Sequence, residues 1–422
     1  MASNAVEVPA EMRALVLSGT GFDALGVKTV PTPRPGPRQL LARVEAAGVC
    51  TSLIKLVEQG PKHSLMHGWD LEKHPGVLGD EGLVSLVEIG EELQGQYELG
   101  QRFVIQPAVD HAPINNRERY PNNGEGVFKL GVSYTLWGHL AEYILIPEEV
   151  LAARCALPVP SEDIAAAHGA MAEPLSCVIS GQDHHVRVVQ EGPLSERQVV
   201  KGLKPGGLTV IVGAGAMGRM HVDLAMSYRP GALVVTDLID ERLARVETLF
   251  GDRARELDIS LHAVNGKSTD VPTLLNDLSG GRGADDVIVA VGSGAAMEAA
   301  QHFTGRAAVL NFFGGLKKGE DIVQVDSGIV HYREIVLTGS SGGSPWDVAR
   351  TLELIAAGEI RPEAHITRVG DLEHVPEFLQ MIRRQELDGK AVVYPSRRCE
   401  EIIQVDSWSD EDERGFLAGG AS

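Results

Sequence analysis

The sequence has few cysteines and no long apolar run. Its four cysteines, Cys50, Cys155, Cys177 and Cys399, form no C-x-x-C pair and no regular spacing, which argues against a disulfide framework. No uncharged apolar stretch reaches the roughly 18 residues that a membrane-spanning helix needs. The N-terminus also lacks the basic start and apolar stretch of a secretory signal. We therefore expect a reduced, cytoplasmic protein with no membrane partner.

Basic residues are scarce relative to acidic ones. There are 38 lysines and arginines against 58 aspartates and glutamates, a formal net charge of −20 at pH 7. Such a charge repels phosphate backbones, so nucleic acid is not an expected partner. The length of 422 residues exceeds what one hydrophobic core usually organises, and this favours two domains.

Two patterns of strands divide the chain. Residues 1–150 contain short apolar strands interrupted by Gly and Pro, which is typical of a β-rich lobe; the strands are expected at 13–17, 26–30, 39–46, 82–89 and 101–105. After this lobe, apolar strands alternate with helical segments, which indicates a doubly wound parallel sheet; these strands are expected at 208–212, 232–236, 286–291, 307–312 and 334–337. The acidic residues 397–422 are too polar to bury much of themselves, so we expect a mobile tail.

A glycine-rich turn predicts a dinucleotide site. The segment Gly213-Ala-Gly215-Ala216-Met217-Gly218 follows an expected strand and precedes a helical stretch. The first glycine allows a tight turn, the second lets the backbone approach a pyrophosphate, and the third lets strand and helix pack closely. The helix N-terminal amides would face the phosphates.

The end of the next strand favours NAD as the cofactor. Asp237 stands where a carboxylate can accept hydrogen bonds from the adenosine ribose hydroxyls, and it would repel the 2′-phosphate of NADP. Arg242 could relieve that repulsion, or it could stack on the adenine.

An ordered set of motifs resembles the zinc-containing medium-chain dehydrogenases, in particular their polyol and sugar-phosphate branch. The motifs run from residue 12 to residue 394 and comprise Gly48-Val-Cys50-Thr-Ser52, Gly79-Asp80-Glu81-Gly82, Gly138-His-Leu-Ala-Glu-Tyr, Glu173-Pro-Leu-Ser, Val291-Gly292-Ser293 and Gly389-Lys390-Ala-Val-Val. The resemblance implies a GroES-like catalytic domain from residues 1–178 and 343–396, and a Rossmann NAD-binding domain from residues 179–342. Val291 and Gly292 would then line the cofactor site.

The same resemblance implies one catalytic zinc. It places the ion on Cys50, Asp80 and one or both of Glu81 and Glu173, and it gives Ser52 the role of relaying the alcohol proton. Lys55 stands where polyol dehydrogenases commonly have histidine; it could hold a phosphate or hydroxyls, or be a solvated surface lysine. Zinc-bearing relatives often hold a second, structural zinc on four cysteines, but residues 110–131 contain none. We therefore expect one catalytic zinc and no structural zinc.

One departure from the family pattern concerns Asp80, because the family normally has histidine at this position. Thiolate, aspartate and one glutamate carry three negative charges against the two positive charges of zinc, which predicts a weaker Lewis acid. Asp80 could instead be a turn residue that only orients other groups. His63, His67 or His74 could replace the missing ligand, although surface histidines fit their sequence equally.

These observations favour a zinc-dependent oxidoreductase that interconverts a secondary alcohol and a ketone on a polyol, sugar, cyclitol or sugar phosphate with NAD(H). Two alternatives stay open. One is a zinc-free reductase of the same fold, and the other is a non-catalytic NAD-binding sensor or scaffold. By analogy with the family, we expect a homodimer or a homotetramer.

Overall fold

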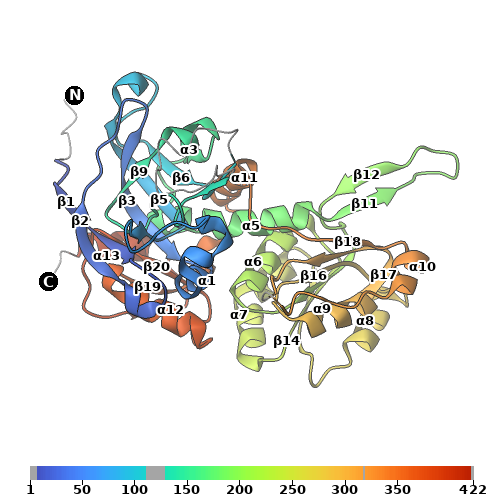
Figure 1. Ribbon diagram of the computed structural model, residues 1–422. Coiled ribbons are helices and arrows are strands. Elements are labelled where there is room, and N and C mark those ends of the chain that lie inside the picture. Colours follow the sequence, from blue (N-terminus) through green and yellow to red (C-terminus); the bar gives the residue numbers. More distant parts are fainter. Residues whose placement is uncertain (1–6, 111–128, 317–318, 420–422) are drawn as a thin grey trace. The chain divides into compact units, whose positions relative to one another are not determined.

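The computed structural model describes residues 7–110, 129–316 and 319–419. Contacts between residues divide the chain into two compact units, Met1–Pro174 with Ser344–Ser422 and Leu175–Gly343 (Figure 1). The first unit is therefore made from both ends of the chain. None of the helices in the described ranges is long and apolar enough to cross a membrane.

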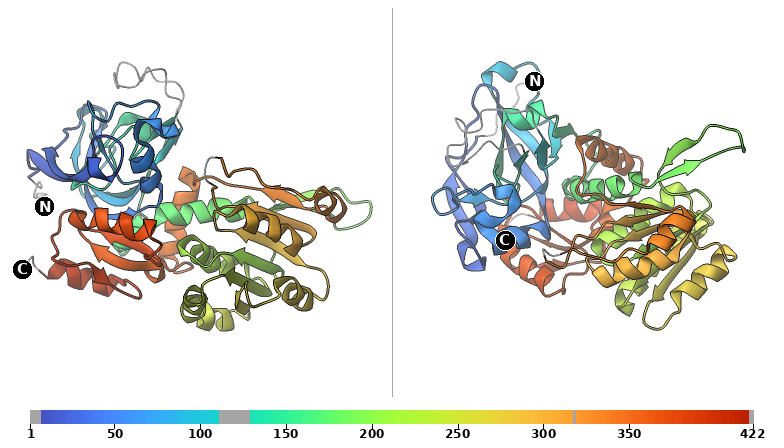
Figure 2. Two further views of the ribbon diagram at one scale, coloured as in Figure 1. Left: turned by 60° about the horizontal axis from the view of Figure 1, so that its bottom comes forward. Right: turned by 45° about the vertical axis from the view of Figure 1, so that its right-hand side comes forward.

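The first unit is built on an eight-stranded sheet with a GroES-like arrangement. Its strands follow the order β10-β6-β5-β3-β20-β19-β21, and β9 pairs with β3. They span Leu40–Val49 (β3), Glu81–Ile89 (β5), Arg102–Ile105 (β6), Tyr143–Ile146 (β9), Ala156–Pro158 (β10), Ile366–Gly370 (β19), Lys390–Val393 (β20) and Ile403–Gln404 (β21). The C-terminal strands β19 and β20, drawn in red, thus join the N-terminal sheet, drawn in blue (Figures 1 and 2).

Smaller elements complete this unit. A three-stranded sheet contains Glu11–Leu17 (β1), Leu25–Pro31 (β2) and Gly76–Val77 (β4), and a two-stranded sheet contains Ala108–Asp110 (β7) and Lys129–Gly131 (β8). The helices are Ser52–Gln59 (α1), Glu148–Ala152 (α3), Ala166–Ala170 (α4), Pro345–Ala356 (α11), Val375–Arg383 (α12) and Asp410–Ala418 (α13). Alternate residues of β1 and β3 supply much of the core, because successive strand side chains point to opposite faces.

The second unit is a Rossmann domain with a six-stranded, wholly parallel sheet in the order β15-β14-β13-β16-β17-β18. Its strands are Leu208–Val212 (β13), Ala232–Asp237 (β14), Ser260–Asn265 (β15), Ala284–Val289 (β16), Thr304–Phe312 (β17) and Val336–Thr338 (β18). The five strands expected from the sequence match five of these to within a few residues. Both faces of the sheet are buried, which explains their near-continuous apolar runs.

Helices cover both faces of this sheet. Ala216–Ala225 (α6) and Asp240–Glu256 (α7) pack on one face, and Val271–Ser279 (α8) and Gly294–Ala300 (α9) pack on the other (Figure 1). The remaining elements are Ala172–Asp183 (α5), which begins in the first unit, Ser327–Arg333 (α10), and a hairpin of Val186–Val189 (β11) with Gln198–Lys201 (β12).

The prediction of a mobile acidic tail was wrong for residues 397–419. Strand β21 pairs with β19, and helix α13 packs against the first unit. Trp408 and Glu413 are buried there, and the Glu413 carboxylate accepts hydrogen bonds from the amides of Ala166 and Ala167 at 2.7 and 2.8 Å. Asp410 is partly buried and lies 3.1 Å from His168, whereas Glu411 and Asp412 are exposed, so the acidic composition did not reveal which residues of this segment are buried.

Candidate active site

The pairing of β3 with β5 brings together three predicted metal ligands. Cys50 directly follows β3 and Asp80 directly precedes β5, and the antiparallel register sets Gly48 opposite Glu81. Because the end of one strand thus meets the start of the other, one ligand atom each from Cys50, Asp80 and Glu81 lies within 4.8 Å of the others.

Glycine at position 48 makes room for this cluster. A Cβ added to Gly48 would lie only 2.0 Å from Glu81 Oε2, so the Glu81 side chain occupies the space directly over the glycine backbone. Glu81 itself is fully buried. The Gly48-Val-Cys50 motif therefore positions the carboxylate as well as the thiol.

Lys390, for which the sequence predicted no role, joins the cluster from the other side of β3. Strand β20 pairs with β3 so that Ala391 lies opposite Val49, and this places Lys390 beside the end of β3. Its Nζ donates a hydrogen bond to Glu81 Oε1 at 2.5 Å, and the ammonium is buried. Burial alone would lower the pKa of Lys390, but Glu81, Cys50 and Asp80 together raise it. The available signal was a charged residue that opens the apolar strand Lys390-Ala-Val-Val.

The buried anions of the cluster have unsatisfied oxygens. Asp80 Oδ1 and Glu81 Oε2 are both buried and have no hydrogen-bond partner. Burial and the Glu81 charge raise the pKa of Asp80 to about 6, and burial with the Asp80 and Glu81 charges raises the pKa of Cys50 well above its usual value. Such groups are costly to bury without a cation. A thiolate with carboxylate oxygens is a donor set that zinc accepts, so the residues present fit that ion.

Glu173, the fourth predicted ligand, lies at the start of α5 and is buried. Its charge contributes to the raised pKa of Cys50, although it is not one of the three converging groups. A role for Glu173 as ligand stays a prediction.

Ser52 connects the cluster to a tyrosine. Its Oγ donates a 2.5 Å hydrogen bond to Asp80 Oδ2, and Ser52 also hydrogen bonds with Tyr134. Burial, with the nearby Asp80 and Cys50, raises the pKa of Tyr134, so its hydroxyl keeps the proton. Ser52 therefore lies in a chain of hydroxyl and carboxyl groups, whereas Tyr134 was not anticipated.

Lys55 and the candidate histidines of the first unit lie outside the hydrogen-bonded chain of Ser52, Asp80 and Tyr134. Lys55 is exposed on α1, and with burial it lowers the pKa of His63. Within the described ranges, the cluster of Cys50, Asp80 and Glu81 includes no histidine. Residues 111–128, most of the stretch where we expected no structural zinc, lie outside the described residues.

The glycine-rich turn of the second unit has the shape that a pyrophosphate site requires. Gly213 adopts a φ of +103°, and a Cβ on Gly218 would lie 1.8 Å from the Gly213 carbonyl oxygen. By contrast, a Cβ on Gly215 would meet nothing within 4 Å. Helix α6 begins at Ala216, followed by Met217, and no side chain caps its N-terminus. Its first amides are thus available to an anion.

Asp237 is tied to this turn. Its Oδ2 accepts a hydrogen bond from the Ala214 amide at 2.7 Å, and Oδ1 accepts from Leu238 and Ile239. Arg242 Nη1 lies 3.9 Å from Asp237 Oδ2, so the guanidinium is near the carboxylate but makes no close hydrogen bond. The carboxylate therefore lies beside the glycine turn, where it can orient a ribose.

Val291 and Gly292 lie at the same end of the sheet. A Cβ on Gly213 would be 3.3 Å from Val291 Cβ, and one on Gly292 would be 2.7 Å from the Gly315 carbonyl oxygen. The structure thus brings Val291 next to the turn, as β13 and β16 are parallel neighbours.

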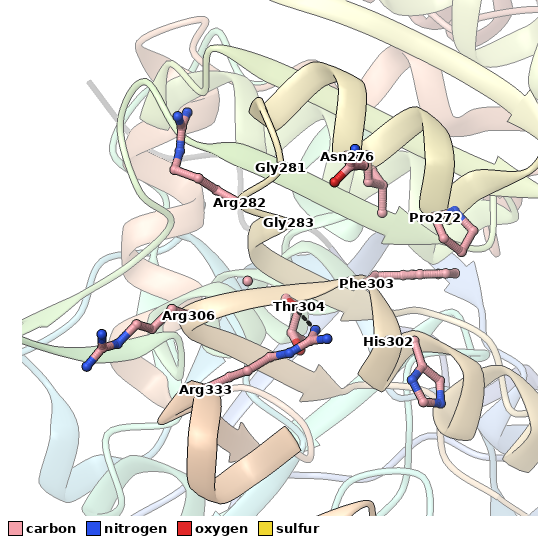
Figure 3. A pocket seen from close by; sticks show the side chains of 12 residues that line it. Pro272, Asn276, Gly281, Arg282, Gly283, His302, Phe303, Thr304, Arg306 and Arg333 are labelled. Atoms are coloured by element: carbon pink, nitrogen blue, oxygen red, sulfur yellow. Dashed lines mark hydrogen bonds between the residues drawn. The ribbon is translucent and has the colours of Figure 1, made fainter. Parts of the chain in front are cut away.

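A separate pocket of about 340 Å³ lies at the opposite, amino end of the parallel strands (Figure 3). Arg282, Arg306 and Arg333 line it, together with residues before β16 and β17, and none of its lining residues is acidic. In Figure 3, Arg333 reaches Thr304, whose carbonyl accepts its hydrogen bond at 2.5 Å. No predicted cofactor residue lines this pocket.

Comparisons with known proteins match two segments of the chain to family models. Residues 216–357 match the family model described as "Zinc-binding dehydrogenase", and residues 36–161 match "Alcohol dehydrogenase GroES-like domain".

Among relatives, the mannitol-1-phosphate 5-dehydrogenase of Aliivibrio fischeri is 32% identical over 89% of this chain and 85% of its own length. The L-sorbose 1-phosphate reductase of Klebsiella pneumoniae is 29% identical over 82% of this chain and 79% of its own. An alcohol dehydrogenase from Escherichia coli CFT073, solved with NADH, has a TM-score of 0.70 at 19% identity, covering 92% of this chain and 100% of that one. At this identity the structural likeness establishes the fold alone.

Proposed function

Because this chain belongs to the zinc-binding alcohol and polyol dehydrogenase family of oxidoreductases, we propose that it interconverts a secondary alcohol and a ketone on a polyol, sugar, cyclitol or sugar phosphate with NAD(H). The convergence of Cys50, Asp80 and Glu81, with two buried oxygens lacking partners, carries the proposal. Burying such a cluster of charged groups costs free energy unless a cation binds to it.

In this proposal, Cys50, Asp80 and Glu81 hold the zinc, with Glu173 as a further oxygen donor. A zinc ion there would polarise the substrate oxygen and lower the pKa of the hydroxyl group. The Lys390 ammonium offsets the third negative charge of the ligand set, since it is hydrogen bonded to Glu81. For the set of Cys50, Asp80 and Glu81, this compensates the extra negative charge that Asp80 introduces in place of histidine, whereas Glu173 as a fourth ligand would leave a net charge of −1.

Ser52 moves the alcohol proton. Its hydroxyl can accept a proton from the substrate while passing its own onward toward solvent, and its hydrogen bond to Asp80 Oδ2 orients it for this role. Tyr134 keeps its proton and holds the Ser52 oxygen in place. Lys55, exposed on the helix that begins at Ser52, is the candidate for contact with a phosphate or with distal hydroxyls of the substrate.

The cofactor in this proposal is NAD rather than NADP. Gly213, Gly215 and the amides of Ala216, Met217 and Gly218 hold the pyrophosphate, and Asp237 accepts hydrogen bonds from the ribose. Arg242 packs beside the adenosine, and Val291 and Gly292 line the nicotinamide side of the turn. The carboxylate at position 237 disfavours a 2′-phosphate by like-charge repulsion.

The substrate class rests on two relatives, whose names give a hexitol phosphate and a ketose phosphate as their substrates. We expect this chain to act on a compound with the same arrangement of neighbouring hydroxyls, with or without a phosphate.

The test is a panel of polyols, sugars and their phosphates read by NADH absorbance, with metal analysis of the same protein purified without chelator. Asp80→Asn should lower kcat at least 100-fold, Asp80→His should retain activity and zinc, and the exposed control Asp277→Asn should match the wild type. Activity unaffected by chelators in metal-free protein would favour the zinc-free reductase. Tight NADH binding with no turnover, even in Asp80→His, would favour a non-catalytic sensor.

A further inference from the structure

A second group of metal-binding side chains lies in the first unit, away from the active-site cluster. Asp371 caps a short 3-10 helix, Leu372–His374, that follows β19, and His374 is the last residue of that helix. Cys399 lies in the segment between β20 and β21. One ligand atom each from Asp371, His374 and Cys399 lies within 4.8 Å of the others. Asp371 is buried, whereas the other two are partly exposed.

The register of β19 and β20 separates this group from the active site. Gly370, just before Asp371, pairs with Val393 at one end of β20, whereas Lys390 starts the other end. A strand of this length spans about 10 Å. The two groups therefore cannot share one ion.

The distances within the group suit a tetrahedral ion. His374 Nδ1 lies 2.9 Å from Asp371 Oδ1 and 3.8 Å from Cys399 Sγ. Ligands on one tetrahedral zinc are separated by about 3.3 Å for nitrogen and oxygen and about 3.5 Å for nitrogen and sulfur, given its usual bond lengths. Small shifts of the partly exposed side chains would bring both separations to these values.

The local charges also suit a divalent cation. Glu373, the exposed neighbour, pairs with Arg398 at 2.7 Å, and Arg13 pairs with Glu142 at 3.1 Å. This leaves the Asp371 carboxylate as one negative charge, and the Cys399 thiol would supply a second on losing its proton to bind zinc.

Local capping accounts for only part of this arrangement. Asp371 accepts from the Glu373 amide, and His374 Nδ1 lies 3.3 Å from the Asp371 amide, as in a capping box. Capping does not require the thiol of Cys399, which belongs to a segment beyond β20. The Cys399 amide donates to Asp371 Oδ2 at 3.1 Å and orients the residue toward the group.

We propose that Asp371, His374 and Cys399 bind a second zinc ion, with a fourth position open to solvent. This ion joins the start of α12 to the chain that leads into β21 and α13, so it fastens the C-terminal segment onto the sheet. The absence of a four-cysteine motif near residues 110–131 says nothing about such a mixed-donor site. The proposal is independent of the substrate and of the cofactor.

Metal analysis of the full chain, purified without chelator, tests the proposal. We expect two zinc ions per wild-type chain, one in Cys399→Ser, one in Cys50→Ser, none in the double variant and two in the control Cys155→Ser. Cobalt-loaded Cys50→Ser should show thiolate-to-cobalt charge-transfer absorption that the double variant lacks. Cys399→Ser should retain its dehydrogenase activity, which separates this site from the active site.

Two results would overturn the proposal: zinc absent from Cys50→Ser, or two ions retained in Cys399→Ser. Alkylation provides a check that does not depend on how well a variant folds. Zinc should protect Cys399 of the wild-type chain from iodoacetamide, as measured by peptide mass spectrometry, and equal labelling with and without zinc would contradict the site.

Discussion

The Lys390 ammonium donates a 2.5 Å hydrogen bond to the Glu81 carboxylate, although 309 residues separate them in the chain. Both groups are buried. Strand β3 lies between their strands, with Glu81 at its end on one side and Lys390 on the other. The pair therefore joins the two ends of the chain at the active site.

Removing this ammonium should destabilise the protein. In metal-free protein, Lys390→Met leaves the fully buried Glu81 charge without a partner, which should lower the free energy of unfolding by about 3–5 kcal/mol in urea titrations. The exposed control Lys73→Met should change it little.

A double-mutant cycle isolates the interaction between the two side chains. Lys390→Met combined with Glu81→Gln should cost clearly less than the sum of the single changes, since no charge is then left unpaired. Additive effects of the two substitutions would argue against a coupled buried pair.

The glycine turn allows folding and cofactor binding to be separated. Gly218→Ala should lower the Tm and weaken NADH binding at least tenfold, because its Cβ would strike the Gly213 carbonyl oxygen. Gly215→Ala meets no protein atom within 4 Å, so it should keep the Tm and lose NADH affinity alone. Fluorescence titration and thermal melts measure both effects. Wild-type NADH affinity in Gly215→Ala would place the pyrophosphate elsewhere.

The C-terminal helix should be required for stability. Glu413 accepts hydrogen bonds from the Ala166 and Ala167 amides and from the Tyr394 hydroxyl at 2.7 Å. Glu413→Ala leaves these donors unpaired and should cost about 3 kcal/mol, whereas the exposed neighbour substitution Glu411→Ala should cost little. Deleting residues 397–422 should also lower the Tm, and an unchanged Tm would restore the idea of a dispensable tail.

His221 should make the second unit sensitive to acid. Burial, with a smaller contribution from His185, lowers the pKa of His221 to about 3 from 6.5. A lowered folded-state pKa means that only the unfolded chain takes up this proton between pH 6.5 and 3. The stability that the neutral, buried His221 contributes is therefore fully present above pH 6.5 and is lost as the pH falls. The free energy of unfolding should decrease by about 2 kcal/mol between pH 7 and pH 5 for this reason.

The variant His221→Asn should flatten this pH dependence of stability, whatever it does to the absolute Tm. The exposed control His302→Asn should leave the slope as in the wild type, because it removes no buried group. Thermal melts at several pH values measure the slopes, and an unchanged slope in His221→Asn would exclude this histidine as the cause.

Local patterns in the sequence were enough for five of the six strands of the parallel sheet and for the glycine turn. The apolar runs of β13 and β14 reflect burial on both faces of a parallel sheet, and Gly213 to Gly218 must be free of side chains for steric reasons that act between near neighbours. Cys50, Asp80 and Glu81 were identified through the family resemblance of two short motifs, and the structure brings them together because their strands pair directly. The acidic composition of residues 397–422 misled the prediction, since burial of Glu413 and Trp408 depends on partners far along the chain.

The sequence by itself thus determined the two lobes and the glycine turn, which follow from short-range periodicity and backbone sterics, and the family, which follows from the resemblance of an ordered set of short motifs. Only the tertiary structure decided that Lys390 compensates Glu81, that Tyr134 joins Ser52, and that Asp371, His374 and Cys399 meet. Those contacts arise from strand pairing between distant segments, and electrostatic balance in a buried site depends on every charge the fold brings there, not on the charges that are neighbours in sequence.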